Sequence, residues 1–564
     1  MRAIAALCAI AFCFGCGPSG RDNGACTPGD LRCDGLTLQT CVNDQFQNSM
    51  TCPMACSPQL GCTLCVPGTG TCNGNESHAC AEDGMGFVDT TCDPIQGETC
   101  DPSNGQCSGP CAPQALGNSY IGCEYYPTVT GNTTGTTFDF AVAIANTTST
   151  PAMVTIDGGA LTSSQMVVVA PNAVTVQTLP WVPALKLCAT PDTDGCLFGE
   201  GTFHYAALAA KGGYHLRSTS PVTIYQFNSL EYVKNGVFSY SNDASLLLPV
   251  NVWRSKYFAA AWQQVGGTNA SEMAVTARAD NTMVTITSKA ATPADQGAPA
   301  FAAGTPQSVM LNAGDVLEIA SITGDLTGSL IDSSAPVQLI SGHYCADVPD
   351  GVAACDHLEE SIFPVDTLGT HYIINAPAVT SIPAGKAEVV RVIATADNTT
   401  LTYDPPVAGA PTTIATAGSF IEIPSNAASY QITADQKVLV AQYMEGQDAG
   451  GGTGDPAMTL AVPIEQFRSS YLFHAPTSYE SNYVDVTAPM GAVISLDGGN
   501  PLTLTPIGGS GFGLARVPAL TAGPASDGNH NIQGDKAFGI TIYGYGQYTS
   551  YWYPGGLNLD TIVE

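Results

Sequence analysis

The sequence predicts an all-β protein in which tandem β-sandwich-like units follow a small disulfide-rich N-terminal region. Three observations carry this prediction. The chain of 564 residues contains 60 Gly and 38 Pro but only 12% charged residues, a composition that favours strands joined by turns. Segments such as residues 138–145 alternate β-forming side chains, and turn residues follow them at intervals of roughly ten. Most of the 21 cysteines lie before residue 124.

The first residues are typical of an export signal. The apolar run 3–15 is too short to span a membrane. It ends at Cys16 before a polar tether, 17–25, and resembles a bacterial lipoprotein signal, although Cys13 stands where that family usually has Leu. We expect residues 1–16 to be the signal and Cys16 to carry lipid, with simple cleavage and release as the alternative.

The charge balance excludes some partners. The formal net charge of −31 comes from 17 Lys and Arg against 48 Asp and Glu. Nucleic acid is not expected as a ligand, because affinity for phosphates comes mainly from clustered Lys and Arg. Contact with a membrane is expected only through a lipid anchor at Cys16. The predicted location is the cell envelope, as an outer-membrane-anchored lipoprotein facing the cell surface, or the medium, as a secreted protein.

Twelve cysteines form two repeats of six, over residues 26–62 and 65–107, within a disulfide-rich region at 26–110. The first three cysteines of the two repeats are offset by the same 39 residues. Each repeat has little apolar content, so we expect disulfides to stabilise it. Export also favours disulfides over zinc-bound thiolates. Three bridges per repeat are expected, and the sequence leaves their connectivity open.

The remaining exported cysteines suggest local bridges. With Cys8 and Cys13 lost in the signal and Cys16 lipidated, 18 of the 21 cysteines remain, an even number. The candidate pairs outside the repeats are Cys111 with Cys123, Cys188 with Cys196, and Cys345 with Cys355.

Residues 111–564 contain a second, longer repeat. A strand ending in an aromatic residue recurs, as at 220–227, and a Pro-containing strand follows it, as at 245–250. The spacing of about 100 to 115 residues accommodates seven or so short strands, which suits a β-sandwich better than a propeller blade. We expect four units, at approximately 111–265, 266–380, 381–480 and 481–564.

Residues 341–360 stand out because they place two Cys, two His, two Glu and three Asp in twenty positions. We expect an insertion peculiar to the second unit, in which a Cys345 to Cys355 bridge holds polar side chains outward for recognition. The binding-loop candidates are His343, Asp347, Asp356, His357, Glu359 and Glu360. The alternative is a metal-binding protein or metal-dependent hydrolase that uses His343, His357, Glu359 and Glu360, but export favours bridged over ligating cysteines.

Catalytic patterns are missing from the sequence. It has no His-Glu-x-x-His, no Gly-x-Ser-x-Gly and no phosphate-binding Gly-rich loop ahead of a helix. We therefore expect no enzyme, no catalytic residues, no metal and no cofactor. A structural Ca²⁺ is left open by the carboxylates beside Gly at 192–195 and 347–351. Neither segment reproduces an EF-hand loop, and turn chemistry explains both equally well.

The stretch 341–360 is also similar to a known motif. Gly342-His-x-Cys345, the Pro349 turn, Cys355-Asp-His-Leu-Glu-Glu360 and Pro364-Val resemble a domain family found at the N-terminus of the mucus IgG Fc-binding protein and in many secreted bacterial proteins, including myxobacterial ones. The resemblance covers roughly Cys111 to the C-terminus. It implies an extracellular, non-catalytic adhesion or binding domain and offers no catalytic residues. We do not transfer IgG binding, which is named for the animal protein.

These observations favour one function. We expect a cell-surface lipoprotein that binds an extracellular protein or glycan through its β units, held away from the membrane by the cysteine-rich repeats. A purely structural envelope component is the remaining alternative.

Overall fold

The computed structural model describes residues 26–188, 202–266, 269–383, 385–449, 452–518, 520 and 527–562. The expected lipid site at Cys16 lies outside these residues. In the described part of the chain no helix is long and apolar enough to cross a membrane. The chain divides into two compact units, a cysteine-rich unit up to Pro94 with Glu98–Ser108, and a β body made of Ile95–Gly97 and Gly109 onward. The all-β prediction is confirmed.

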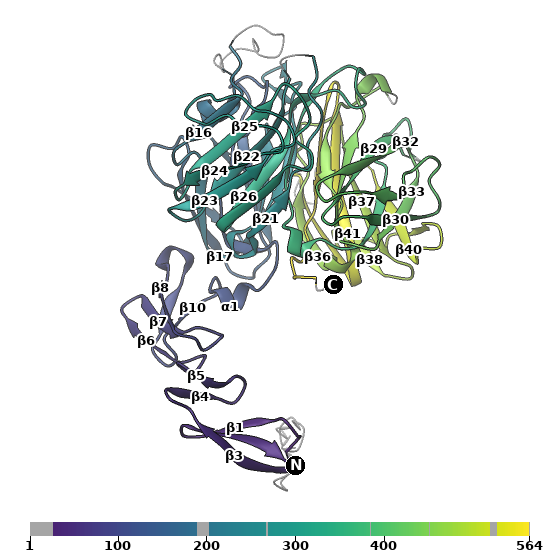
Figure 1. Cartoon of the computed structure of the whole chain (residues 1–564). Helices are drawn as coiled ribbons and strands as arrows, with labels where there is room; N and C mark the ends of the chain where they lie inside the picture. Colours follow the sequence, from purple (N-terminus) through teal and green to yellow (C-terminus); the bar gives the residue numbers. More distant parts are fainter. Residues whose placement is uncertain are drawn as a thin grey trace, which may run out of the picture. The chain divides into compact units, whose positions relative to one another are not determined.

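The cysteine-rich unit consists of two small modules of short antiparallel strands (Figure 1). The first module contains β1 (Leu31–Asp34), β2 (Thr37–Val42), β3 (Gln45–Thr51), β4 (Ala55–Ser57) and β5 (Gly61–Thr63). The second contains β6 (Gly70–Asn73), β7 (Glu76–Cys80), β8 (Phe87–Thr91), β9 (Thr99–Asp101) and β10 (Gln106–Ser108). The short 3-10 turn η1 (Pro94–Gln96) lies between β8 and β9, and its residues Ile95 and Gln96 belong to the β body.

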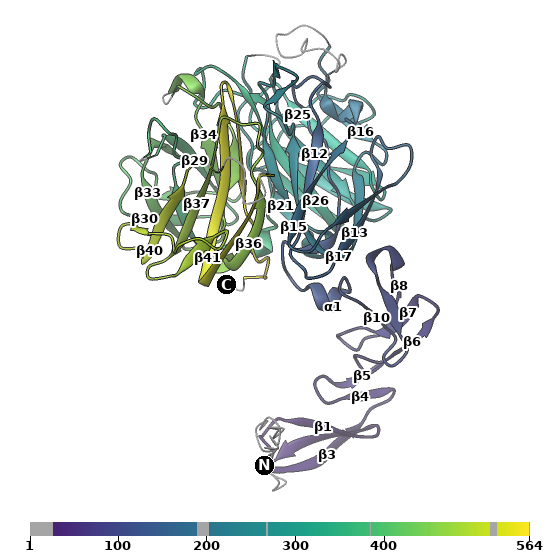
Figure 2. The same cartoon turned by 180° about the vertical axis from the view of Figure 1, so that it is seen from behind.

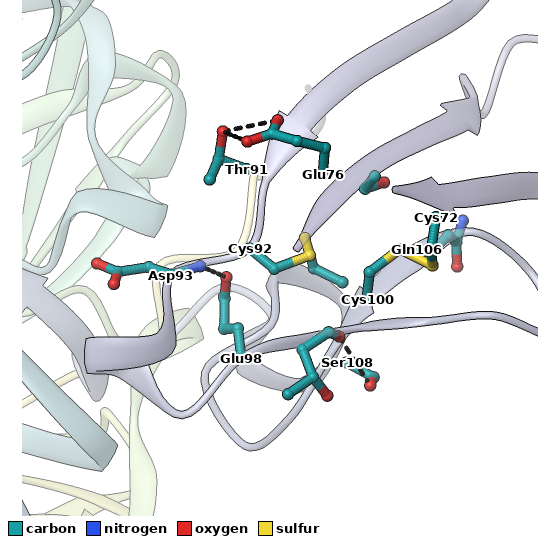
Figure 3. The surroundings of a disulfide bond; sticks show 12 residues. Cys72, Glu76, Thr91, Cys92, Asp93, Glu98, Cys100, Gln106 and Ser108 are labelled. Atoms are coloured by element: carbon teal, nitrogen blue, oxygen red, sulfur yellow. Dashed lines mark hydrogen bonds between the residues drawn. A yellow bond between two sulfur atoms is a disulfide. The ribbon is translucent and has the colours of Figure 1, made fainter. Parts of the chain in front are cut away.

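Both modules share one disulfide connectivity, which pairs the first cysteine with the third, the second with the fifth and the fourth with the sixth. The bridges are Cys26–Cys41, Cys33–Cys56 and Cys52–Cys62 in the first module, and Cys65–Cys80, Cys72–Cys100 and Cys92–Cys107 in the second. Figure 3 shows Cys72–Cys100, with the Thr91 hydroxyl donating to Glu76 nearby. The disulfides therefore stabilise these modules, as a hydrophobic core stabilises larger domains.

The β body contains four copies of one seven-stranded β-sandwich. With strand positions lettered a to g, the first has β11 (Gly122–Tyr125), β12 (Phe140–Asn146), β13 (Ala152–Gly158), β14 (Gln165–Val169), β15 (Ala173–Leu179), β17 (Tyr214–Asn228) and β20 (Ala244–Leu247). The second has β21 (Arg254–Phe258), β22 (Ser271–Ala277), β23 (Thr282–Thr287), β24 (Pro306–Leu311), β25 (Val316–Ser321), β26 (Leu330–Ala346) and β27 (Asp356–Ser361).

In the third sandwich position f is split in two. Its strands are β28 (His371–Asn375), β29 (Glu388–Ala394), β30 (Thr399–Asp404), β31 (Thr413–Ile414), β32 (Phe420–Asn426), β33 (Ser429–Ala434) with β34 (Val438–Met444), and β35 (Met458–Leu460). The fourth has β36 (Arg468–His474), β37 (Ser481–Pro489), β38 (Ile494–Leu496), β39 (Thr505–Pro506), β40 (Phe512–Val517), β41 (Asn529–Gly546) and β42 (Thr549–Pro554).

A few short elements lie outside this repeat. They are α1 (Pro113–Leu116), η2 (Pro183–Lys186), β16 (Ala206–Ala209), the hairpin β18 (Val233–Lys234) and β19 (Val237–Phe238), η4 (Val250–Val252), η5 (Val365–Thr367), η6 (Gln447–Ala449) and η7 (Ile464–Gln466).

Strand f organises every sandwich. Its first half pairs with strands a and c, and its second half pairs with strands b and g, so that two sheets share one strand. In the third sandwich the break between β33 and β34 separates the sheets completely. Buried side chains of both sheets, among them Ile374, Val392, Ile432 and Val440, form a core between them.

The aromatic strand that the sequence placed at the end of each unit instead begins the next one. Strand β21 pairs with β26, β28 with β33 and β36 with β41, so the expected boundaries at 265, 380 and 480 each fall after a first strand. The reason is a repeated tyrosine. The hydroxyl of Tyr257 accepts the amide of Arg254 at 2.9 Å and donates to the carbonyl of Val337 on strand f at 2.7 Å. The equivalent side chains are Tyr125, Tyr372 and Tyr471.

The four sandwiches form a ring around their last strands. Strand β20 contacts β27 and β42, and β35 contacts the same two strands. All four strands are buried along their whole length. Figures 1 and 2 show the first two sandwiches in blue to teal and the last two in green to yellow.

The ends of the β body close this ring. The Tyr120 amide donates to the carbonyl of Leu557 at 3.2 Å, and the Leu559 amide donates to the carbonyl of Asn118 at 3.4 Å. A guanidinium nitrogen of Arg468, in the fourth sandwich, lies 2.6 Å from the side-chain oxygen of Asn558.

Candidate functional site

The segment 341–360 joins two strands of the second sandwich. It begins within β26 and ends within β27, and a disulfide links Cys345 to Cys355 across the turn. Cys111 and Cys123 are linked as well. Cys188 is in a disulfide, whereas Cys196 lies outside the described residues.

The expected outward orientation of the binding-loop candidates is wrong. His343, Asp356, His357, Glu359 and Glu360 are at most 1% exposed, and only Asp347 is half-buried. The reason is the place of β27 in the ring. Every residue of β27 is buried, because the strand pairs with β26 of its own sandwich and also contacts the last strands of the neighbouring sandwiches. No face of β27 is therefore left for a ligand.

A buried carboxylate that the sequence did not single out lies at the centre of the ring. Oδ1 of Asp243 accepts the amides of Ala244 at 2.9 Å and Trp552 at 3.1 Å. Its Oδ2 accepts the amides of Met458 at 3.0 Å and Glu359 at 3.1 Å. The four amides belong to the last strands of the four sandwiches, so one side chain connects all of them. Burial raises the pKa of Asp243, and the amide donors oppose that rise.

Three of the predicted residues serve the same contacts. Asp356 accepts the amide of Asn242 at 2.8 Å and the Thr549 hydroxyl at 3.0 Å. Glu359 accepts the hydroxyls of Thr130 at 2.9 Å and Ser245 at 3.1 Å. Glu360 accepts the amides of Leu246 at 3.2 Å and Ser361 at 3.0 Å. The carboxylates of the second sandwich therefore accept hydrogen bonds from donors of the first and fourth sandwiches. Their role is to hold the sandwiches together.

The histidines and two further glutamates complete this buried cluster. Glu272 Oε1 lies 3.8 Å from Nδ1 of His357, and neither carboxylate oxygen of Glu272 has a hydrogen-bond partner among the described residues. Burial raises the pKa of Glu272 and Glu318 well above the usual value, and the neighbouring carboxylates add to the rise. Burial lowers the pKa of His343 to about 3, so its ring is neutral and accepts the amide of Cys345 at 3.0 Å.

The cluster does not have the geometry of a metal site. Within the described ranges, no group of three or more His, Cys, Asp or Glu side chains is arranged to hold a metal ion. The carboxylates of Glu359 and Glu360 are instead taken up by donors on different strands.

An open cleft of about 700 Å³ lies between the first two sandwiches and is the better candidate for a ligand. Charged side chains and three glycines line it. The lining residues are Glu124, Tyr126, Asp157, Gly158, Lys211, Gly213, His215, Arg278, Ala279, Asp280, Ala313 and Gly314. Clefts with a few converging polar groups are where proteins most often take ligands. Sequence patterns did not reveal this cleft, because its lining residues are spread over almost two hundred positions.

Charge pairs fix the geometry of this cleft. Glu124 lies 2.9 Å from Nε2 of His215 and 3.0 Å from the guanidinium of Arg278. Although burial favours the neutral acid, the hydrogen bond to His215 and the charge of Arg278 hold the pKa of Glu124 below its usual value. The ring of Tyr126 stacks on that of His215, with centroids 4.8 Å apart. Lys211 is exposed at the rim, and its ammonium group makes no hydrogen bond or ion pair with any described residue.

Comparison with known proteins agrees with the resemblance carried by 341–360. The sequence profile of the family described as IgGFc binding protein matches residues 243–544. The human IgGFc-binding protein is 25% identical over 315 residues, which are 55% of this chain and 6% of the human protein. The chain thus corresponds to a small part of that relative. No solved structure matches significantly. The profile covers more than half of the chain, which therefore belongs to the IgGFc-binding protein family.

Proposed function

We propose that this protein is an exported, non-catalytic binding protein that recognises an extracellular protein or glycan through its β body. Membership of a family of binding proteins supports this function. The human relative is named for binding the Fc part of IgG, and the ligand of this chain is a separate question. The disulfide connectivity repeated in the two modules fits an oxidising location outside the cytoplasm.

The cleft between the first two sandwiches is the observation that carries the proposal. Its charges are held in place by paired side chains on strands of two rigid sandwiches, so little order is lost when a ligand binds. Lys211 supplies a cation without a partner in the described chain, and Arg278, whose side chain is 54% exposed, still faces solvent. We propose that a carboxylate or other anionic group of the ligand enters between these two cations.

Capture from an envelope extract tests this function. The bait is the mature chain with Cys16→Ser, which stays in solution whether or not the native protein is lipidated. The double variant Lys211→Ala with Arg278→Ala is expected to lose at least 90% of the specifically captured protein or polysaccharide. Lys256→Ala, which removes an exposed cation from β21, serves as the matched control. Failure of the wild-type bait to capture anything specific would overturn the proposal.

The lipid anchor is part of the same proposal. Lipid on Cys16 would hold the β body to a membrane through the tether and the two cysteine-rich modules. Mass spectrometry of the mature N-terminus is expected to find a diacylglyceryl group on Cys16, and Cys16→Ser is expected to release the protein into the medium. An unmodified N-terminus at any residue would leave a secreted binding protein without an anchor.

A further inference from the structure

Three exposed aromatic rings gather at one place on the β body, and we call them the aromatic patch. Phe238 is 43% exposed, Tyr240 41% and Tyr548 37%. In the described residues only one other aromatic side chain is exposed, Phe87 of the cysteine-rich unit. The patch joins two segments that are far apart in sequence, one at the end of the hairpin β18–β19 and just after it, and the other at the turn between β41 and β42. Chance exposure does not explain such a gathering, because exposed aromatic surface is unfavourable in water.

The first segment is held rigidly. Asn235 and Gly236 both have positive φ, 54° and 78°, which is the two-residue turn that matches the twist of a hairpin. Strand β19 ends at Phe238, and the ring of Tyr240, two residues further on, stacks beside that of Phe238, with ring centroids 6.2 Å apart and planes 13° from parallel. The buried ring of Tyr232 supports Phe238 from beneath, at 5.3 Å.

The second segment holds a tyrosine in an unfavourable backbone conformation. Tyr548 has φ +59°, a left-handed conformation that bulky residues rarely adopt. With Gln547 it forms the two-residue loop between the paired residues Gly546 and Thr549. Its amide donates to the side-chain oxygen of Gln447 at 3.0 Å. Its ring lies 6.3 Å from that of Tyr240 in an edge-to-face arrangement. The tight turn thus holds the exposed ring of Tyr548 at the surface beside Tyr240.

The size of the patch decides between two kinds of partner. An aromatic side chain offers about 200 Å², so three rings at roughly 40% exposure present about 250 Å². A stable protein interface needs roughly 800 Å² on each side. The patch is too small for that, but it suits two or three sugar rings, whose apolar C–H faces pack on aromatic rings while their hydroxyls bond to polar neighbours.

The charges around the patch point to a neutral sugar. Lys234, on the hairpin, is already paired with Asp139 at 2.7 Å and Glu231 at 3.2 Å. The hydroxyl of Tyr232 donates to Glu480 at 3.1 Å. These pairs leave no free cation on the two segments for a carboxylate or sulfate. The polar groups near the rings include tyrosine hydroxyls and the amide side chains of Asn235, Gln447 and Gln547, which suit sugar hydroxyls.

We propose that the aromatic patch is a binding site for a neutral glycan, with Phe238 and Tyr240 stacking on one or two sugar rings and Tyr548 packing beside them. This inference rests on the proposed function, because it names the ligand class for one part of the β body. It is separate from the cleft, whose charges suit an anionic group.

Affinity electrophoresis of the mature Cys16→Ser chain provides the test. The neutral probes are dextran, galactan and a soluble chitin oligosaccharide series, and alginate is the acidic probe. At least one neutral probe is expected to retard the wild-type chain. The double variant Phe238→Ala with Tyr240→Ala is expected to weaken that binding at least tenfold, whereas Phe87→Ala, which removes the other exposed ring, is expected to change nothing.

A second variant separates binding from folding. Tyr548→Gly removes a ring and relieves its unfavourable φ, so it is expected to weaken glycan binding while the melting temperature stays the same or rises. Retardation by alginate alone, or equal retardation of wild type and double variant by a neutral glycan, would overturn the glycan site and leave the proposed function standing. Capture of an envelope protein without any glycan binding would do the same. Failure of both captures would overturn both proposals.

Discussion

The two units of this protein are stabilised in opposite ways. The first cysteine-rich module has only a minimal buried cluster, centred on Leu38, Cys52 and Cys56, and each module is closed by three disulfides. The β body has extensive apolar cores and few bridges, and its four sandwiches meet at buried polar groups around Asp243. Small domains thus obtain stability from covalent constraint, whereas large ones obtain it from packing.

Reduction of the disulfides is expected to produce the largest difference in stability between the two units. Each lost bridge costs roughly 2–5 kcal/mol in a small domain, so a reducing agent should unfold both modules completely. The β body should persist, because Cys345 is fully buried and packing stabilises its sandwiches. Limited proteolysis followed by mass spectrometry should find cuts within residues 26–108 first. Equally fast cutting within 122–554 would show that the two units do not differ in this way.

Asp243→Ala is expected to have the next largest effect. The change leaves four buried amides without their acceptor, and at about 1–3 kcal/mol for each unsatisfied donor the β body should lose roughly 4 kcal/mol or more. Urea unfolding followed by tryptophan fluorescence measures this loss, because all four tryptophans lie in the β body. Asp350→Ala, at an exposed acid, is the control. If the Asp243→Ala variant were as stable as this control, Asp243 would not be what holds the four sandwiches together.

Glu272 makes the stability of the β body depend on pH. The pKa of Glu272 is raised in the folded state. Its contribution to the free energy of unfolding is therefore fully present below its pKa in the unfolded chain, about 4.3, and is lost as pH rises through its pKa in the folded protein. The melting temperature of the wild type should therefore fall more between pH 5 and pH 9 than that of Glu272→Gln, which cannot ionise.

The cysteine-rich unit is the internal reference for this comparison, because Glu272 belongs to the β body. Its own melting transition should respond to pH in the same way in both proteins. Parallel melting curves of the β body for wild type and variant would show that Glu272 is not the group responsible.

Removal of one repeated hydroxyl is expected to have the smallest effect. Tyr372→Phe deprives the amide of Gly369 and the carbonyl of Val438 of a buried partner, which should cost about 1–2 kcal/mol. Tyr548→Phe removes the hydroxyl of a side chain that is 37% exposed and should cost almost nothing. Equal loss in both variants would mean that the repeated tyrosine does not fasten strand a to strand f.

Local patterns in the sequence were enough to predict the fold class and the repeats. Alternation at 138–145 marks strand β12, and the equal cysteine offsets reflect two modules with one connectivity. The unit boundaries could not be placed from these patterns. An aromatic strand that follows a Pro-containing strand looks like its continuation, and only the pairing of β21 with β26 shows that it begins a new sandwich.

The polar residues of 341–360 could not be placed by such patterns either. A sandwich strand normally has one covered face, so consecutive acids in Asp356–Ser361 indicate an exposed loop. Here both faces of β27 are covered. The donors that make burial tolerable come from remote positions, such as Thr130, which is 229 residues from Glu359, and Trp552, which is 309 residues from Asp243. The burial of the polar residues in β27 therefore depends on the assembly of all four sandwiches into the ring, which local sequence patterns do not show.

The bridge between Cys111 and Cys123 has a mechanical consequence. Tension that reaches Cys111 along the chain would pass through the bridge directly to Cys123, at the start of the first sandwich. The segment 112–122, which contains the ring-closing contacts of Asn118 and Tyr120 with the C-terminal segment, would carry none of the force. The contacts that close the ring can thus persist while the protein is under tension. Reduction of this one disulfide would place the tension on those contacts.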